Sequence, residues 1–589
     1  MSTPVRKTLD DVNVMVAGQG GDGSLTIITL LSRLLGARGY HMFASRNVAS
    51  RIKGAHAAGL LRGATVPRAC LGDHLDILIA FDSEAIEVAG ERLTADGIVI
   101  FDSSLGDIDR TRMKEGVRAL SIPFGRLAVR DLRRDLFKNS LSFGVLTRVL
   151  GIDDDEALAC LAQHFKSLAP AARDANLLAA RGGFDYAGEQ GMERGKGHWT
   201  LARAQAGKRL LMTGNEAVGF GFLAAGGRVF AGYPITPATD IMDWLAPRLP
   251  KFGGVVVQAE DELAAINLGI GASMTGARAM TATSGPGLAL MMEGISQLGS
   301  AEIPLVIVDC QRAGPSTGMP TKPEQSDIGM IVHGGNGDLP RIVLAPGNPT
   351  DAFELSVAAV NLANRLQCPV FLLLDQSVSQ DSATVPPFDI DAVTIDNGKR
   401  LTAEEVAAMP QYRRYEITED GVSPWALPGT PGGMNLITGN EHDEWGYVTT
   451  KPDIRVKMVD KRARKIRLAA DRLPRARRFG DPGARVGLLG IGLELGVIQE
   501  AEERLAKAGH RFECLQPRTV WPIPEETLEF IRSHDRTYVI EHNASGQLAQ
   551  LLRSAGAPAD KICSVLRYDG RPFRPAELVD AILQGEAAK

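Results

Sequence analysis

The sequence predicts a multidomain α/β protein, and three observations lead to this class. Short apolar runs rich in β-branched residues, bounded by Gly or Pro, alternate with helical patterns along most of the 589 residues. Polar residues gather directly after several of these runs. The chain is 44% hydrophobic with 64 glycines, and its length suits three or four domains, each large enough to bury a core.

The first domain is expected at 1–190 and begins as a Rossmann-like unit. Strand 12–18 leads through a Gly-rich turn at 19–24 into a helix at 25–39. The backbone N–H groups of this turn could approach a ligand at the helix N-terminus, or the glycines could serve the tight turn alone. Further runs continue the sheet, at 75–81, 97–101 and 116–124. A segment poor in periodicity at 191–207 is interpreted as a linker.

The central domain is expected at 208–395 and holds the candidate site. Its apolar runs, typical of buried parallel strands, are 228–232, 253–260, 277–285 and 304–311. Open α/β sheets bind ligands along the edge formed by the carboxyl ends of their strands. Glu262 follows one run at the start of a helical pattern, and Arg312 follows another. The pair indicates a site for a cationic or polarisable cofactor and an anionic substrate.

Specific motifs in this region carry a family resemblance. Tyr233-Pro-Ile-Thr-Pro237 resembles the signature loop of the 2-oxoacid:ferredoxin oxidoreductases, which use thiamine diphosphate, and Gly214-Asn-Glu-Ala217 resembles their lead-in helix. The whole chain resembles the α subunit of the 2-oxoglutarate-type members with the γ domain fused at its N-terminus. The resemblance implies a Rossmann-like γ domain, a thiamine-diphosphate pyrimidine-binding domain and a transketolase C-terminal-like domain.

The resemblance also assigns site residues. Glu262 is chosen over Glu260 and Asp261 as the carboxylate that hydrogen-bonds the aminopyrimidine, because Gly271 and Gly276 follow it at the family's spacing. An acid in this trio could instead be a charge favoured by the helix N-terminus. The implied catalytic residues are Glu262, Arg312 and Thr236, the substrate-binding residues are Tyr233, Thr236, Arg312, Thr321 and Lys322, and the cofactor-binding residues are Glu262, Pro234, Ile235, Ser284 and Gly285.

Some of these assignments have alternatives. Lys322 could be a solvated lysine, and Ser284-Gly285 could be backbone architecture near the cofactor ring rather than a direct contact. Arg312 has the geometry to clamp a 2-oxoacid carboxylate through two parallel hydrogen bonds, which Lys lacks.

No metal ligand is assigned to this chain. Gly21-Asp22-Gly23 imitates a metal–diphosphate motif, but it lies in the first turn of the chain rather than deep inside a domain.

The N-terminal resemblance is imperfect. Gly-rich residues 18–21 resemble the opening of the γ domain, and Ser50–His56 resembles a later loop of it. Arg51 stands where the family usually has Glu, and Ala55 where it usually has a second Gly.

The remaining chain is expected to form an irregular connector with a basic helix at 396–482 and the transketolase-like domain at 483–589. Asn440–Gly446 looks like a metal cluster but resembles a family loop. Segment 451–480 carries twelve Lys or Arg against three Asp, which predicts a solvated amphipathic linker helix or, less simply, a surface that binds nucleic acid or an acidic partner. His542 is interpreted as a structural or interface residue.

Composition bounds the function further. The net charge of −5 argues against nucleic-acid binding, no apolar run approaches the roughly 18 residues of a membrane span, and the N-terminus has no signal core, so a cytoplasmic protein is expected. None of the cysteines forms a CxxC pair, which predicts no iron–sulfur or zinc site on this chain. They stand at positions 70, 160, 310, 368, 514 and 563.

The resemblance implies conversion of 2-oxoglutarate and CoA to succinyl-CoA and CO₂ with reduction of ferredoxin, or the reverse reductive carboxylation of a reductive TCA cycle. A partner β subunit would carry the diphosphate site with Mg²⁺ and a [4Fe-4S] cluster, in an α₂β₂ heterotetramer. Pyruvate or a branched-chain 2-oxoacid is the alternative substrate. A non-redox thiamine enzyme and a non-catalytic binding subunit are the alternative classes.

Overall fold

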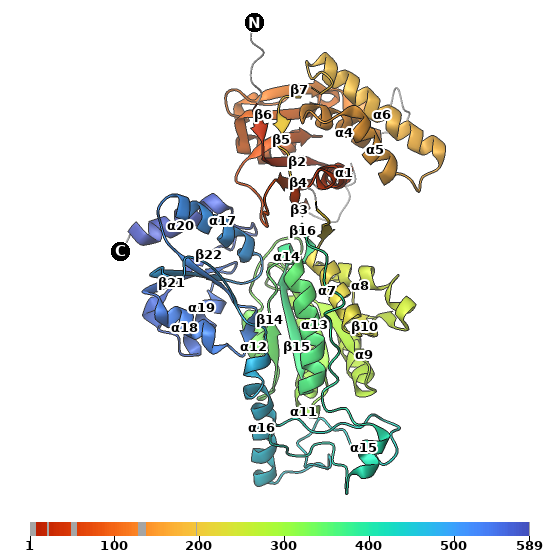
Figure 1. The fold of residues 1–589 in the computed structure, drawn as a ribbon, viewed down its shortest axis with the longest axis vertical. Helices are drawn as coiled ribbons and strands as arrows, with labels where there is room; N and C mark the ends of the chain where they lie inside the picture. Colours follow the sequence, from red (N-terminus) through yellow and green to blue (C-terminus); the bar gives the residue numbers. More distant parts are fainter. Residues whose placement is uncertain are drawn as a thin grey trace. The chain divides into compact units, whose positions relative to one another are not determined.

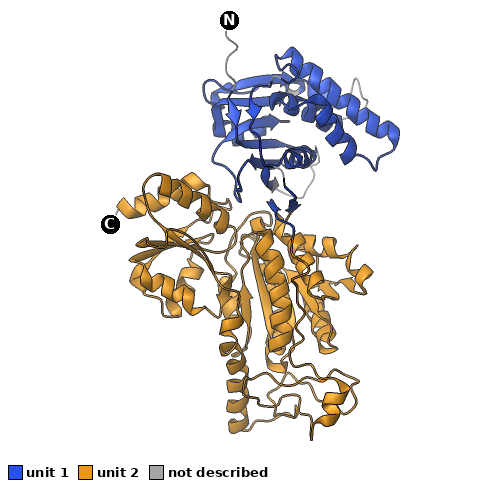
Figure 2. Cartoon of the chain, viewed as in Figure 1, with its two compact units in different colours: residues 1–211, 381–387 blue, residues 212–380, 388–589 orange. Residues whose placement is uncertain are grey.

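The computed structural model describes residues 7–19, 23–48, 56–127, 137–195, 197–205 and 207–587. The chain forms two compact units (Figure 2). The first comprises residues 1–211 and 381–387, and the second comprises 212–380 and 388–589. The predicted features at Gly21-Asp22-Gly23, Arg51 and Ala55 fall on residues that are not described, apart from Gly23.

The first unit is built on a sheet in the order β7-β6-β5-β2-β4-β3-β16-β9 (Figure 1). The predicted parallel strands are present, since β2, β5, β6 and β7 pair in parallel. Strands β3 and β4 form an antiparallel pair that the sequence did not predict. The elements are β1 (Thr8–Leu9), β2 (Asp11–Gln19), α1 (Ser24–Ala37), β3 (His41–Val48), β4 (His56–Ala64), β5 (Leu75–Ala80), α2 (Ser83–Ala89), β6 (Leu93–Asp102), β7 (Arg118–Ile122), α4 (Lys138–Val149), α5 (Asp154–His164), α6 (Pro170–Glu189), β8 (Thr200–Leu201), β9 (Leu210–Met212) and β16 (Ser382–Val385).

The second unit contains a central sheet in the order β11-β10-β12-β13-β15-β14-β20. All neighbours pair in parallel except β20, which is antiparallel to β14. The strands are β10 (Val229–Gly232), β11 (Val255–Gln258), β12 (Ala279–Thr283), β13 (Leu305–Gln311), β14 (Ile342–Leu344), β15 (Pro369–Asp375) and β20 (Thr519–Trp521). The four strands expected around the site are confirmed.

Helices cover both faces of this sheet, as the alternation of side chains along a buried strand requires. Val306 and Val308 of β13 pack with one set of helices, and Leu305 and Ile307 pack with the other. The first set is α7 (Gly214–Ala224), α8 (Thr239–Leu245) and α13 (Pro349–Leu366), and the second includes α9 (Glu262–Met274), α10 (Gly285–Leu290), α11 (Met292–Ala301) and α12 (Ile328–His333).

A further sheet, in the order β17-β19-β18-β21-β22, ends the chain and shares the core of the central sheet on its α9 side. The predicted strand and helix patterns after residue 483 are present. The elements are β17 (Arg477–Gly480), β18 (Val486–Gly490), α17 (Glu494–Lys507), β19 (Glu513–Gln516), α18 (Glu525–Ser533), β21 (Arg536–Glu541), α19 (Gln547–Ser554), β22 (Ile562–Leu566) and α20 (Pro575–Ala587).

Three helices follow the last strand of the central α/β alternation in the sequence and precede the C-terminal sheet. They are α14 (Gln376–Gln380), α15 (Ala403–Ala408) and α16 (Pro452–Arg467). The segment around α15 is otherwise irregular, as expected. Within the described ranges, no helix is both long and apolar enough to cross a membrane.

Candidate active site at the carboxyl edge of the central sheet

The predicted site residues follow neighbouring parallel strands and therefore reach one edge of the sheet. The loop 233–237 follows β10, Glu262 follows β11, Ser284 follows β12 and Arg312 follows β13. These strands are adjacent in the order β11-β10-β12-β13, all in parallel register. The sheet topology thus gathers the residues that the sequence placed together.

The loop 233–237 is fixed from two sides. Asn215, fully buried near the start of α7, donates from Nδ2 to the Pro237 carbonyl at 2.8 Å. Arg312 donates from Nη1 to the Thr236 carbonyl at 2.8 Å. Helix α7 is itself anchored by a reciprocal cap between Thr213 and Glu216. The loop and the arginine therefore form one connected structure.

Glu262 is the buried member of its acidic trio. It is 6% exposed as the first residue of α9, whereas Glu260 is exposed and Asp261 caps the helix by accepting the Ala264 N–H at 2.7 Å. Among the described residues, none donates a hydrogen bond to the Glu262 carboxylate. The side chain is mostly withdrawn from water and its carboxylate has no donor, so a cofactor N–H placed here would supply one.

The space around Glu262 depends on a glycine. A Cβ added at Gly287 would lie 2.5 Å from Glu262 Oε1 and 2.2 Å from Thr283 Oγ1. The Glu262 carboxylate thus occupies space that any side chain at position 287 would fill. Ser284 Oγ, in the same turn, is buried without a partner among the described residues. These unpartnered polar atoms fit a polar cofactor ring, as an aminopyrimidine would be.

Arg312 is suited to an anionic substrate. It is 7% exposed, and burial lowers the pKa of its guanidinium while Asp327 opposes that effect. Its Nε is buried and has no partner among the residues that the structure describes. A carboxylate would provide the missing acceptor, and a charge-assisted hydrogen bond is stronger than a neutral one.

The other predicted substrate residues lie on flanking segments. Thr321 and Lys322 are partly buried in a turn that folds back on Arg312, since Ala313 N–H donates to the Lys322 carbonyl at 3.0 Å. Burial lowers the pKa of Lys322. Tyr233 is 39% exposed, and Pro234 and Ile235 are partly buried. Their individual roles in substrate binding stay predictions.

Two acidic residues of this edge were missed by the sequence analysis. Asp309 of β13 is fully buried, and its carboxyl contacts that of Asp327, before α12. A Cβ at Gly285 would lie 2.6 Å from Asp327 Oδ2, so the pair reaches the predicted cofactor turn. An acidic residue inside the apolar run 304–311 was the available signal, because such residues are rarely buried without a reason.

His542 has a structural environment, as predicted. It is 1% exposed, and its Nδ1 is held by a short contact with Glu494 while Nε2 pairs with the Arg571 carbonyl at 3.1 Å. Its backbone N–H donates to Gln325 Oε1 at 3.2 Å, and Gln325 also bonds Asp375. This network ties β21 to the segment that leads from Arg312 to α12.

The prediction of a solvated basic helix at 451–480 is wrong for three of its cations. Lys461 and Lys465 of α16 are fully buried and bind the two carboxylate oxygens of Glu302 at 2.7 and 2.9 Å. Arg462 is also buried and binds Glu441 at 2.9 Å. These three cations form internal ion pairs, and their acidic partners come from distant segments that the local sequence does not reveal.

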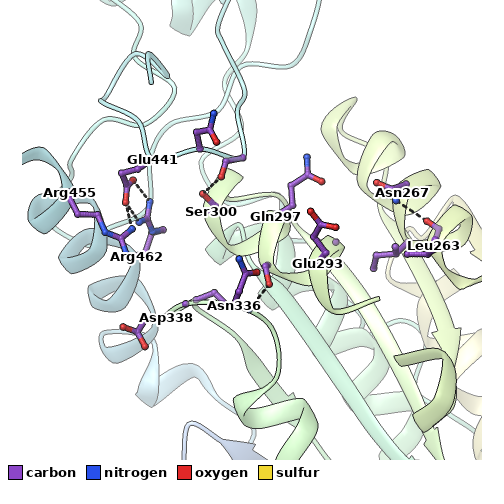
Figure 3. Close-up of a pocket in the computed structure, with 17 residues that line it drawn as sticks. Leu263, Asn267, Glu293, Gln297, Ser300, Asn336, Asp338, Glu441, Arg455 and Arg462 are labelled. Atoms are coloured by element: carbon purple, nitrogen blue, oxygen red, sulfur yellow. Dashed lines mark hydrogen bonds and ion pairs between the residues drawn. The ribbon is translucent and has the colours of Figure 1, made fainter. Parts of the chain in front are cut away.

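The same contacts define the environment of segment 440–446. Glu441 pairs with Arg455 and Arg462, and Glu444 pairs with Arg413 at 3.0 Å. Figure 3 shows Glu441 on one wall of a groove of about 670 Å³, with Leu263 and Asn267 of α9 on the opposite wall. Glu293, Gln297 and Ser300 of α11 line its floor. The groove uses the face of α9 that exposes Leu263, not the buried carboxylate beside it.

Comparisons with known proteins agree with this architecture. Residues 221–461 match a family model described as pyruvate flavodoxin/ferredoxin oxidoreductase, thiamine diphosphate-binding, and residues 13–186 match one described as pyruvate ferredoxin/flavodoxin oxidoreductase. The α subunit of 2-oxoacid:ferredoxin oxidoreductase 2 from Aeropyrum pernix is 31% identical over 639 residues, covering 97% of each chain.

Two further similar proteins have names that specify 2-oxoglutarate. A 2-oxoglutarate synthase subunit of Methanocaldococcus jannaschii is 34% identical, covering 63% of this chain and 98% of its own. A solved structure of 2-oxoglutarate:ferredoxin oxidoreductase from Magnetococcus marinus, with 2-oxoglutarate, coenzyme A and succinyl-CoA bound, is 34% identical. It superimposes with a TM-score of 0.91 and covers 98% of this chain and 99% of that one.

Proposed function

This chain belongs to the 2-oxoacid:ferredoxin oxidoreductases as an α subunit, and from that premise we propose that its substrate is 2-oxoglutarate. The observation that carries the proposal is the similarity along 98% of the chain to an enzyme whose structure holds 2-oxoglutarate, coenzyme A and succinyl-CoA. The gathering of Glu262, Arg312 and loop 233–237 at one sheet edge supports an intact site.

Thiamine diphosphate, when bound, supplies the carbon nucleophile for decarboxylation of a 2-oxoacid. Glu262 would hold the pyrimidine ring by accepting its N–H, and the dry surroundings of the carboxylate would make that hydrogen bond strong. Ser284 and Gly285 would help to hold the ring, together with Pro234 and Ile235 of the loop after β10. Gly287 keeps the space for the carboxylate open.

Arg312 would bind the carboxylate next to the ketone and orient it for loss as CO₂. Its Nη1 is committed to the Thr236 carbonyl, so the guanidinium has a fixed direction before substrate arrives. Tyr233, Thr236 and Thr321 would border the substrate. Lys322, partly buried beside Ala313, would add positive charge suited to a substrate with two carboxylates.

The overall reaction consumes 2-oxoglutarate, CoA and two oxidised ferredoxins, and it yields succinyl-CoA, CO₂, two reduced ferredoxins and one proton. Two electrons leave the substrate as the thioester forms, so a path for electrons must reach the ferredoxin. The widely spaced cysteines of this chain do not suit a cluster. We therefore place the [4Fe-4S] cluster, and the Mg²⁺ that binds the diphosphate, on a partner β subunit.

The assembly is proposed to be an α₂β₂ heterotetramer in the cytoplasm. The same site catalyses the reverse reaction, reductive carboxylation of succinyl-CoA, when reduced ferredoxin is supplied. The direction in the cell depends on the potential of that ferredoxin and on the CO₂ concentration.

The test compares substrates and variants in the native complex. Viologen or ferredoxin reduction is measured with CoA and either 2-oxoglutarate or pyruvate, for the wild type, Glu262→Gln and Glu260→Gln. Removing the buried carboxylate should lower kcat by at least about 100-fold, since a hydrogen bond accepted by a catalytic group in a site that excludes water contributes about 3–4 kcal/mol. The exposed neighbour Glu260 should tolerate the same change, because solvent surrounds it.

The outcomes separate the parts of the proposal. Reduction with 2-oxoglutarate but not pyruvate supports the substrate, and preference for pyruvate or a branched-chain oxoacid overturns it while keeping the chemistry. Full activity of Glu262→Gln contradicts the role given to this carboxylate. Decarboxylation without electron transfer in a cluster-loaded complex would indicate a non-redox thiamine enzyme.

A further inference from the structure

Asp309 and Asp327 form an unusual pair of acids within the second unit. Asp309 lies near the end of β13, opposite Thr283 of β12 and Leu373 of β15, and is 0% exposed. Its carboxyl interacts with that of Asp327, through charge and a side-chain hydrogen bond. Both oxygens of Asp309 and Oδ2 of Asp327 are buried, and no other described residue donates a hydrogen bond to them.

Two carboxyl groups in such contact must share a proton. Two ionised carboxylates side by side in a dry site repel each other, and each loses its hydration. Burial, and then the neighbouring Asp327, raise the pKa of Asp309 well above its usual range. Because both Asp309 oxygens are also buried without a donor, this environment favours a proton on Asp309, which would donate it to Asp327.

Asp327 keeps the single negative charge of the pair near neutrality. Burial and the Glu324 carboxylate raise the pKa of Asp327 to about 6, against the hydrogen bond from Asp309 and the charge of Arg312. The charged or titratable groups facing the pair are thus Arg312 and Glu324, with the buried thiol of Cys310 next to Asp309.

The pair touches both halves of the candidate site. Asp327 Oδ2 abuts Gly285, where an added Cβ would lie only 2.6 Å away, so the carboxyl packs beneath the turn Ser284-Gly285. The charge of Asp327 also acts on Arg312, whose Nη1 is bound to the Thr236 carbonyl. The guanidinium is therefore fixed by the Thr236 carbonyl and feels the negative charge of Asp327.

We propose that Asp309 and Asp327 are a one-proton carboxyl pair that positions Arg312 for the 2-oxoacid carboxylate and seats the turn Ser284-Gly285. The positioning role rests on the proposed function, whereas the shared proton does not. Neither carboxyl needs to touch the substrate. The pair acts through the charge that Asp327 presents to the guanidinium, and it keeps a single negative charge, rather than two, near an anionic substrate.

The substitutions Asp327→Asn and Asp309→Asn have different expected effects on substrate binding. Asp327→Asn removes the charge that faces Arg312, so KM for 2-oxoglutarate should rise roughly tenfold while kcat changes less. In Asp309→Asn the amide still donates to Asp327 and the charge remains, so the rise in KM should be several times smaller. The measurement is steady-state reduction of viologen by the native complex at pH 7.5.

Two measurements on the full chain read the shared proton without any substrate. The infrared difference spectrum between wild type and Asp309→Asn at pH 7.5 should contain the carbonyl band of a protonated carboxylic acid. The folded pKa of Asp309 lies above the unfolded value of about 3.9, so ionisation of the unfolded chain lowers wild-type stability as pH rises above that value. Asp309→Asn should therefore gain in Tm relative to wild type between pH 5 and 8.

The results distinguish failure of this inference from failure of the proposed function. Absence of the carboxylic acid band together with a pH-independent Tm difference overturns the one-proton pair. A band with equal KM values for the two variants overturns the positioning role. If the wild-type complex oxidises no 2-oxoacid yet the band and the pH-dependent Tm difference are present, the pair stands and the assigned reaction fails.

Discussion

At the scale of single residues, the site depends on glycines that leave room for its reactive side chains as well as on those side chains themselves. Gly287 and Gly271 both belong to the helical layer near Glu262, but their surroundings differ. A Cβ at Gly287 would meet the Glu262 carboxylate and Thr283, whereas a Cβ at Gly271 on α9 would meet no atom within 4 Å. The two glycines therefore allow a matched comparison: a side chain at Gly287 would press on the Glu262 carboxylate, and a side chain at Gly271 would press on nothing.

Gly287→Ala should impair catalysis by displacing the Glu262 carboxylate. The added methyl would lie 2.5 Å from Oε1, and relief of such overpacking in a core costs about 1–3 kcal/mol. We expect kcat/KM to fall by roughly tenfold or more, with weaker activation by thiamine diphosphate in a titration of the apo complex. The measurement is that titration, with activity and bound cofactor recorded together.

Gly271→Ala is the control. Alanine is favoured over glycine in a helix by about 0.5–1 kcal/mol, so this variant should be as stable as wild type or slightly more stable, with unchanged cofactor affinity. Equal cofactor affinity in both variants would show that the carboxylate does not need the space that Gly287 leaves.

At the scale of elements, α16 is held by charges rather than by an apolar stripe. Glu302 binds Lys461 and Lys465 of this helix, and all three side chains are fully buried. Lys461 also donates to the Tyr415 carbonyl at 3.2 Å and Lys465 to the Gln367 carbonyl at 2.8 Å. Such a network specifies one register of the helix, because a shift would bury cations without an anion.

Glu302→Gln should destabilise the second unit by about 3–5 kcal/mol, because it leaves two buried ammonium groups without a counter-charge. Glu525→Gln serves as the control, since its partner Arg532 and Glu525 itself are exposed on α18 and such pairs contribute about 0–1 kcal/mol. Urea unfolding followed by tryptophan fluorescence measures both. Equal midpoints for the two variants would contradict the importance of the network.

The ion pairs of Glu302 with Lys461 and Lys465 also predict how stability depends on pH. Burial would raise the pKa of Glu302, but Lys461, Lys465 and Arg414 outweigh burial and hold that pKa well below its usual range. The stabilisation is therefore fully present above the unfolded value of about 4.3 and is lost as pH falls below it. The stability difference between wild type and Glu302→Gln should shrink by up to about 1.4 kcal/mol per pH unit below pH 4.

The elements that the sequence predicted are those with a local signal. Strands β10, β12 and β13 appear as apolar runs, and their parallel pairing follows from the alternation with helices. Strands β16 and β20 were not predicted, because each joins a sheet far away in sequence, β16 beside β3 and β20 beside β14. Nothing in either short segment identifies its partner strand.

The candidate site follows the same division. Glu262, Arg312 and loop 233–237 could be found because each stands directly after a strand and matches a motif. The pairing of Asp309 with Asp327 could not, since it requires the loop after Arg312 to return to the sheet edge. Burial of the α16 cations was missed for the related reason that Glu302 lies more than 150 residues earlier.

At the scale of the whole molecule, the distribution of cysteines separates binding from electron transfer. The cysteines are either buried or half-buried singly, and no group of three or more His, Cys, Asp or Glu within the described ranges could hold a metal ion. A ferredoxin-linked reaction nevertheless moves two electrons away from the substrate. The proposed division of labour gives this chain the substrate and the pyrimidine ring, and gives the partner chain the electron path.

This division predicts that the purified chain alone is colourless and inactive. Anaerobic reconstitution with iron and sulfide should leave less than about one-tenth of a cluster per chain, because cluster assembly needs several cysteine thiolates close together. The same treatment of the complex should give the brown colour and broad visible absorbance of a [4Fe-4S] centre, with viologen reduction restored in proportion. A stoichiometric cluster on the isolated chain would overturn the division, and so would oxidation of 2-oxoglutarate by that chain without a partner.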